Sequence, residues 1–148
     1  MPQQFVKAVI NMTIEDLLIL NEGLRLKPYI DTANKLTIGV GRNLADVGIS
    51  EAEADVLLKN DLARAERELS TLAPWALKLD EVRYAVLVDM CFNLGAHGLS
   101  KFKRFLAAME RRDWADAATE MRNSKWWFQV GARGPRLELM VVNGKWPE

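Results

Sequence analysis

Short stretches of the chain alternate between hydrophobic and polar residues, whereas longer stretches repeat hydrophobic residues at helical spacing. Residues 24–31 (LRLKPYID) and residues 36–41 (LTIGVG) alternate in this way, which is typical of two β-strands. Pro28 has no backbone N–H to donate, so we expect the first strand to lie at the edge of a sheet. The two stretches predict a β-hairpin that turns through residues 33–35.

The same alternation constrains the register of this hairpin. An odd-numbered loop of three or five residues keeps the polar faces together and places Asp31 across from Thr37. A two-residue loop would instead pair Asp31 with Leu36 and mix the faces. We therefore expect Asp31 and Thr37 to be neighbours on the polar face, where the carboxylate and the hydroxyl could hold one water molecule between them.

Helix-start signals flank the predicted hairpin on both sides. The sequence TIED (residues 13–16) resembles a capping box, and the residues after it extend a first helix as far as Gly23, a residue type that often ends helices. The sequence SEAE (residues 50–53) is a second capping box, and it opens a long amphipathic helix through about Thr71. At about 20 residues, this helix would span roughly 30 Å, long enough to join two lobes.

The remainder of the chain is predicted to form a bundle of helices. Asp80 can cap a stretch that is apolar almost all round, residues 81–95, so this helix is expected to be central and buried. Shorter helices are predicted at about 101–111, 114–123 and 135–142. The predicted fold class is therefore α+β and mostly helical: one helix, a small hairpin, a long helix and a helical bundle.

The length and composition suit one domain with room for two lobes, because the chain has 148 residues and 49% of them are hydrophobic. No apolar run approaches the roughly 18 residues that a membrane span needs, and the first 13 residues make a poor signal peptide. The single cysteine, Cys91, excludes an internal disulfide bond. With only one histidine in addition, no metal site is expected.

Charged residues balance to zero over the whole chain but are unevenly distributed. Residues 49–81 carry 4 basic and 8 acidic side chains, whereas residues 82–148 carry 11 basic and 7 acidic ones. A mildly basic C-terminal half would favour an anionic polymer, but it lacks the basic stripe that is typical of a nucleic-acid-binding protein. Nucleic acid is therefore not expected as a partner.

Two carboxylates are candidates for acid/base chemistry. Glu22 lies in the last turn of the predicted first helix, and Asp31 lies on the polar face of the predicted hairpin. Glycoside hydrolysis uses one carboxylic acid to protonate the leaving oxygen and a second carboxylate to act on water or on the sugar cation. Two acids nine residues apart nevertheless occur in almost any soluble chain. Their spacing alone favours ordinary solvated charges.

A longer pattern around these residues resembles the catalytic segment of the phage-type lysozymes, the muramidase/endolysin family (glycoside hydrolase family 24). In that family a Glu is followed after eight residues by Asp or Cys, after five more by Thr, and then by Gly-x-Gly. Glu22, Asp31, Thr37 and residues 39–41 (GVG) match it at every spacing. The resemblance covers nearly the whole chain, including the long helix, LDEVRYAVLVDMCFNLG, FKRFLAAMERRDWADAATEM and SKWWFQVGARGPR.

The resemblance implies a role for each matching residue. Glu22 would be the general acid that protonates the glycosidic oxygen. Asp31 would position or deprotonate the attacking water, and Thr37 would hold that water. Arg133 matches an arginine near the family's acid and would orient it and help to keep the fold closed. Phe92 matches an aromatic residue of the cleft, beneath the sugar-binding groove. Members of the family invert the anomeric centre in a single displacement.

The chain departs from the family at several positions. The family often has a His after the second glycine, paired with an Asp on the long helix. This chain has Arg42 there and Asp61 at the matching helix position, so an Arg42–Asp61 ion pair is predicted, insensitive to pH near neutrality. Phe105 and Glu120 replace cleft residues that are small or amide-bearing in a relative, and no sugar-binding role is assigned to them.

The resemblance also implies a lysozyme-like, two-lobed fold in one domain, residues 1–148. The expected parts are a first helix (1–22) that packs on the helical lobe, a small β lobe (23–50), a linking helix (51–71) and a helical lobe (72–148). The implied protein is a monomer that needs no cofactor and inserts no segment stably into a membrane. It would accumulate in the host cytoplasm and reach the wall in the periplasm through a holin-type membrane lesion.

The implied activity is hydrolysis of the β-1,4 bond between N-acetylmuramic acid and N-acetylglucosamine in peptidoglycan, for host cell lysis. A lytic transglycosylase is one alternative, although it uses a single acid and would not need Asp31 and Thr37. A catalytically silent peptidoglycan-binding module is another, although the acid, the base and the hydroxyl are all present. A helical nucleic-acid-binding protein is a more distant third.

Overall fold

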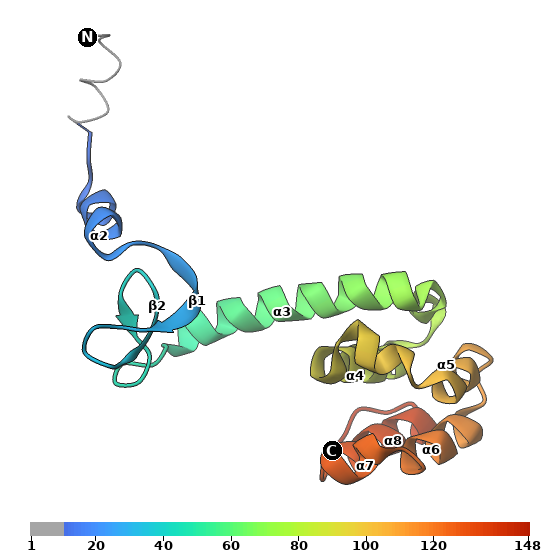
Figure 1. Ribbon diagram of the computed structural model, residues 1–148. Coiled ribbons are helices and arrows are strands. Elements are labelled where there is room, and N and C mark those ends of the chain that lie inside the picture. Colours follow the sequence, from blue (N-terminus) through green and yellow to red (C-terminus); the bar gives the residue numbers. More distant parts are fainter. Residues whose placement is uncertain (1–10) are drawn as a thin grey trace. The chain divides into compact units, whose positions relative to one another are not determined.

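The computed structural model describes residues 11–148, and these form two compact units that meet in sequence at residues 54 and 55. Among the described residues, the first unit contains a short helix and a small sheet, and the second contains most of the helices (Figure 1). The helix α3 (Glu51–Leu72) begins at the end of the first unit and continues in the second. This mostly helical α+β composition agrees with the predicted fold class. Within residues 11–148, no helix is long and apolar enough to cross a membrane.

The first helix, α2 (Ile14–Glu22), begins and ends at the residues that the sequence predicts. The Thr13 hydroxyl accepts a hydrogen bond from the backbone N–H of Asp16 (3.1 Å), and the Asp16 carboxylate accepts one from the N–H of Thr13 (2.9 Å). This reciprocal capping box lowers the pKa of Asp16. At the other end, Gly23 has φ of 76° and donates its N–H to the carbonyl of Ile19, which ends the helix.

The sheet of the first unit has three antiparallel strands in the order β1-β2-β3. These are β1 (Arg25–Ile30), β2 (Leu36–Gly39) and β3 (Arg42–Asn43). Strand β1, which contains Pro28, lies at an edge, as its missing N–H predicts. The two-residue strand β3 was not predicted, because a stretch this short carries no periodicity.

The predicted hairpin register is wrong, because the turn lies one residue earlier in the chain than predicted. Thr37 lies opposite Tyr29, not opposite Asp31, and Ile30 lies opposite Leu36. The chain turns through residues 32–34, where Asn34 adopts the left-handed conformation (φ 60°) that its short polar side chain tolerates. The Asp31 N–H donates to the carbonyl of Lys35 (2.9 Å), which closes a three-residue loop. An odd loop length is therefore confirmed, and the side-chain alternation keeps Asp31 and Thr37 on the same face as diagonal neighbours.

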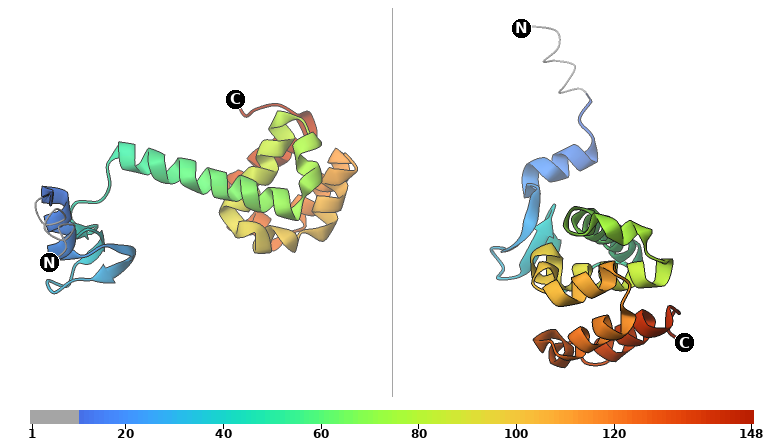
Figure 2. Two further views of the ribbon diagram at one scale, coloured as in Figure 1. Left: turned by 90° about the horizontal axis from the view of Figure 1, so that it is seen from above. Right: turned by 90° about the vertical axis from the view of Figure 1, so that its right-hand side faces the viewer.

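The second unit consists of helices whose buried side chains form one core, and Figure 2 shows these helices from two further sides. Their bounds are η1 (Pro74–Lys78, a 3₁₀ helix), α4 (Glu81–Ser100), α5 (Lys103–Glu110), α6 (Trp114–Arg122), α7 (Lys125–Gln129) and α8 (Arg133–Asn143). Asp80 caps α4 as predicted, accepting a hydrogen bond from the N–H of Arg83 (3.1 Å). The predicted end at Gly95 is a kink (φ 73°, ψ 163°), after which the helix resumes. The short helix α7 was not predicted.

The core of the second unit is built around the apolar surface of α4, as its sequence predicts. Val86, Leu87 and Met90 of this helix are fully buried, together with Phe105 of α5 and Met121 of α6. The tight contact of these side chains supplies most of the stability of a small helical unit. Phe105 therefore occupies a packing position.

Candidate active site

Glu22 is placed at the end of α2, where its carboxylate meets the backbone of the chain segment between β2 and β3. A β-carbon added to Gly41 would lie 2.7 Å from Glu22 Oε2 and 3.0 Å from its Cδ. The carboxylate thus lies directly against the Cα of Gly41, which has no side chain to displace it. Glu22 is exposed to solvent within this unit, so a ligand can reach its acid group.

Asp31 lies at the turn of the hairpin, and its side chain closes that turn. Its Oδ1 atom accepts hydrogen bonds from the backbone N–H groups of Ala33 (2.9 Å) and Lys35 (2.8 Å). Asp side chains favour turns because they can satisfy nearby N–H groups in this way. The hydrogen bonds among residues 11–148 engage Oδ1 alone, so the carboxylate has a fixed orientation and a second oxygen that can contact water.

Thr37 is buried, with 2% of its surface exposed, and it approaches Asp31 through a shared neighbour. Its hydroxyl donates a hydrogen bond to the carbonyl oxygen of Lys35 (2.9 Å), while the N–H of the same residue donates to Asp31. The two predicted catalytic residues therefore bind the same peptide backbone: Asp31 the N–H of Lys35 and Thr37 its carbonyl group. Because the hydroxyl proton is already used, a water molecule at Thr37 would have to donate its own proton to Oγ1.

The predicted Arg42–Asp61 ion pair would join the two units and stays a prediction, and within its own unit each residue has another partner. Arg42 binds both carboxylate oxygens of Glu53 (2.8 and 2.9 Å), and Asp61 pairs with Arg64 one helical turn away (2.8 Å). The hydrogen bonds and charge of Arg42 lower the pKa of Glu53, and those of Glu53 raise the pKa of Arg42.

Glu53 also explains why the second predicted capping box forms only in part. Its N–H donates to the Ser50 hydroxyl (3.1 Å), but its carboxylate binds the guanidinium of Arg42 and not the Ser50 N–H. The physical reason is that two charge-assisted hydrogen bonds are stronger than one bond to a neutral N–H.

Two predicted residues, Phe92 and Arg133, line one groove of the second unit. Phe92 of α4 is 43% exposed, and Arg133 begins α8. Asp89, for which the sequence predicted no role, lies in the same groove with its Oδ1 3.1 Å from the Arg133 Nε. Its only signal in the sequence is a carboxylate within an otherwise apolar stretch. The predicted contact of Arg133 with the acid stays a prediction.

The environment of Asp89 is unfavourable for a charge. Its Oδ1 is inaccessible to solvent and has no hydrogen bond among the described residues, although Arg133 lies at ion-pair distance. Burial raises the pKa of Asp89, and the positive charges of Arg133 and Arg136 oppose this only in part. The chain therefore retains a carboxylate beside Arg133 at a cost in stability.

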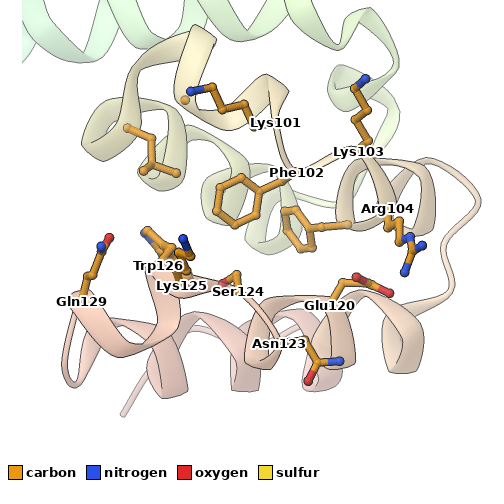
Figure 3. A pocket seen from close by; sticks show the side chains of 13 residues that line it. Lys101, Phe102, Lys103, Arg104, Glu120, Asn123, Ser124, Lys125, Trp126 and Gln129 are labelled. Carbon is orange, nitrogen blue, oxygen red and sulfur yellow. The ribbon is translucent and has the colours of Figure 1, made fainter.

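A further pocket of the second unit lies between the C-terminal part of α4 and the helices α5, α6 and α7 (Figure 3). Glu120 and Asn123 of α6 line it, and so do the basic residues Lys101, Lys103, Arg104 and Lys125. Phe102 and Trp126 meet edge to face at one side, with ring centroids 6.2 Å apart. Within residues 11–148, no group of three His, Cys, Asp or Glu side chains could hold a metal ion.

Comparisons with known proteins place the chain among lysozymes. The pattern of the family described as phage lysozyme matches residues 20–140. Probable T4-type lysozyme 1 of Dictyostelium discoideum is 29% identical over 89% of this chain and 95% of its own length. The pre-baseplate central spike protein Gp5 of Enterobacteria phage T4 is 30% identical over 90% of this chain, which spans only 28% of Gp5. An endolysin of Acyrthosiphon pisum secondary endosymbiont phage 1 is 28% identical over 80% of this chain and 79% of its own length.

Proposed function

The chain belongs to the phage lysozyme family, and we propose that it hydrolyses the β-1,4 bond between N-acetylmuramic acid and N-acetylglucosamine. Membership of this family makes the protein a lysozyme-type peptidoglycan hydrolase. In the proposed reaction, Glu22 protonates the glycosidic oxygen and Asp31 activates a water molecule on the opposite face of the sugar. The reaction inverts the anomeric centre in one displacement and needs no metal or organic cofactor.

The observation that carries this proposal is the different setting of the two carboxylates in one small unit. Glu22 lies against the backbone at Gly41, free of side-chain ion pairs among the described residues, so a substrate can reach its acid group. Asp31 is held by two backbone N–H groups, so it keeps a fixed direction towards a water molecule. An acid and a base that differ in environment are what hydrolysis by paired carboxylates requires.

The roles of the second unit complete the proposal. Phe92 would contact sugar rings through its exposed face, since aromatic side chains stack on apolar sugar faces. Arg133 would orient the acid, and the carboxylate of Asp89 beside it would fix the direction of its guanidinium. We further propose that the protein acts as a monomer on the cell wall, in host cell lysis, after accumulating in the host cytoplasm. A relative named as an endolysin supports the lytic role.

The experiment is mass spectrometry of the muropeptides released from purified peptidoglycan by the wild type and by Glu22→Gln. Products with a free reducing muramic acid, absent with the variant, are expected. The wild type and the variant should bind walls equally in a pull-down, because the substitution changes one oxygen to nitrogen at an exposed site.

Two other results would replace the proposal with a different function. Anhydro-muramic ends would make the protein a lytic transglycosylase and would leave Asp31 without a catalytic role. No release of muropeptides by the wild type, with binding to walls retained, would identify a silent wall-binding module. Full activity of Glu22→Gln would remove Glu22 as the acid.

A further inference from the structure

Gly41 is in contact with the carboxylate of Glu22 and is the one glycine of the first unit with such a neighbour. A β-carbon at Gly41 would lie 2.7 Å from Oε2, a distance that real β-carbons essentially never show. All three of the nearest atoms belong to the Glu22 side chain, namely Oε2, Cδ and Cγ, with no backbone among them. The Glu22 carboxylate thus occupies space that a side chain at position 41 would need.

The conformation of Gly41 does not by itself distinguish it from its neighbours. Gly41 has φ of 65°, and Gly39 and Gly48 have almost the same values, 69° and 66°. All three positions therefore favour glycine for the same steric reason. A β-carbon at Gly39 or Gly48, however, would meet no atom within 4 Å. Only at Gly41 does a side chain compete with the acid.

The segment that carries Gly41 is anchored on its C-terminal side. The next residue, Arg42, pairs with Ile38 in the sheet, and its guanidinium binds Glu53 and the carbonyl of Gly48. Gly41 cannot readily retreat from an added side chain, because its neighbour is held by backbone and side chain alike. The more movable partner in a clash is the Glu22 side chain, which ends in a free carboxylate.

We propose that Gly41 is a positioning residue for the general acid: its bare Cα supports the Glu22 carboxylate, and any side chain there displaces that carboxylate from the glycosidic oxygen. This inference rests on the proposed function of Glu22. A displacement of about 1 Å at a reacting group can lower a rate about 100-fold. The effect falls on kcat, because Gly41 changes the position of the acid and not the surface that binds the sugars.

The test compares Gly41→Ala with Gly39→Ala, a matched control with the same backbone strain and no neighbour at the β-carbon. Both variants should lose stability on urea denaturation, and Gly41→Ala should lose more, because only its β-carbon meets the Glu22 side chain. Gly41→Ala should lower kcat on soluble peptidoglycan fragments by about 10- to 100-fold with little change in KM. Gly39→Ala should keep both kcat and KM close to the wild-type values. Equal losses of kcat in the two variants would overturn the proposal and leave backbone strain as the sole role of Gly41.

A second measurement reads the contact without using activity. Glu22→Ala removes the atoms that a β-carbon at Gly41 would meet, so Gly41→Ala should cost less stability in the Glu22→Ala background than in the wild type. The double variant should fold even if Gly41→Ala alone does not. If the stability losses of Gly41→Ala and Glu22→Ala simply add in the double variant, the proposed contact between the two residues is wrong. If Glu22→Gln is fully active, the proposed role of Glu22 as the acid fails instead, and this stability coupling still reports whether the contact exists.

Discussion

Arg42 binds Glu53 through two parallel hydrogen bonds, 2.8 Å from Nη1 to Oε2 and 2.9 Å from Nη2 to Oε1. The pair joins strand β3 to the first turn of α3, and Nη1 also donates to the carbonyl of Gly48 (3.0 Å). A planar guanidinium matches a carboxylate in this two-point geometry, whereas an ammonium does not. The position after the Gly-x-Gly motif is thereby held by the start of the long helix.

Replacing Arg42 with Ala is expected to lower stability more than activity, because Arg42 contacts neither carboxylate of the proposed reaction. Arg42→Lys keeps the positive charge but loses the two-point geometry, so its stability should lie between those of Arg42→Ala and the wild type. Urea denaturation and kcat measured on the same samples check this. A loss of activity with unchanged stability would contradict the structural role.

The contribution of the Arg42–Glu53 pair to stability should change with pH in the acid range and stay constant near neutral pH. Arg42 lowers the pKa of Glu53 in the folded protein, so the pair stabilises the fold above the unfolded pKa of a Glu, about 4.3. The contribution is lost as the pH falls through the lower, folded pKa. The difference in unfolding free energy between the wild type and Arg42→Ala should therefore be constant from pH 6 to 8, by the same linkage, and shrink below about pH 4. A change in that difference near pH 7 would contradict the assignment.

Asp31→Asn should separate the two roles of Asp31. The amide oxygen of Asn can still accept hydrogen bonds from Ala33 and Lys35, so the turn should form and the thermal midpoint should change little. The loss of the carboxylate should lower kcat about 100-fold or more if Asp31 activates the attacking water. Asp31→Ala, which loses the turn contacts as well, should in addition be less stable. Unaffected turnover in Asp31→Asn would exclude Asp31 as the base.

Thr37→Val should reveal what the buried hydroxyl contributes. The substitution preserves shape and removes the hydrogen bond to the Lys35 carbonyl, which still accepts from the Asp31 N–H, so a stability loss of about 1 kcal/mol is expected. Thr37→Ser keeps the hydroxyl and serves as the control. If Thr37 holds the attacking water, kcat should fall in the Val variant and recover in the Ser variant. Equal activity in both would limit Thr37 to the turn.

Asp89→Asn should become relatively more stable as the pH rises. Burial raises the pKa of Asp89 on folding, so between its unfolded pKa of about 3.9 and its higher folded pKa the native state binds the extra proton. Stability from this residue therefore falls as the pH increases through that window. The unfolding free energy of the variant relative to the wild type should increase between pH 3 and pH 7.

Asp16→Asn provides a control of opposite sign, because the pKa of Asp16 is lowered on folding by its capping contacts with Thr13. Its stability relative to the wild type should decrease over the same pH range. If the unfolding free energies of the two variants, each relative to the wild type, changed with pH in the same direction, the assigned environment of Asp89 would be wrong. If Asp89→Asn also loses activity, the carboxylate is retained for Arg133 and not for folding.

Local signals in the sequence predicted most of the secondary structure correctly. The capping box at Thr13 and the glycine at position 23 bound α2, and Asp80 caps α4. These predictions succeed because each depends on residues within one or two turns of chain, whose hydrogen bonds form wherever the helix lies. The alternation around Pro28 placed β1 at the sheet edge for a similarly local reason. The turn was misplaced by one residue because its side-chain hydrogen bonds, not the alternation, select the closing pair.

The sequence by itself determined most of the helices, the edge strand, the spacing of Glu22, Asp31 and Thr37, and through that spacing the family. Only the tertiary structure decided which residues meet: Glu53 with Arg42, Asp89 with Arg133, and Gly41 with Glu22. The physical reason is that a charged side chain has several partners of equal charge within reach, and a glycine has equal freedom wherever φ is positive. The choice among them depends on distances of a few ångströms that periodicity along the chain does not encode.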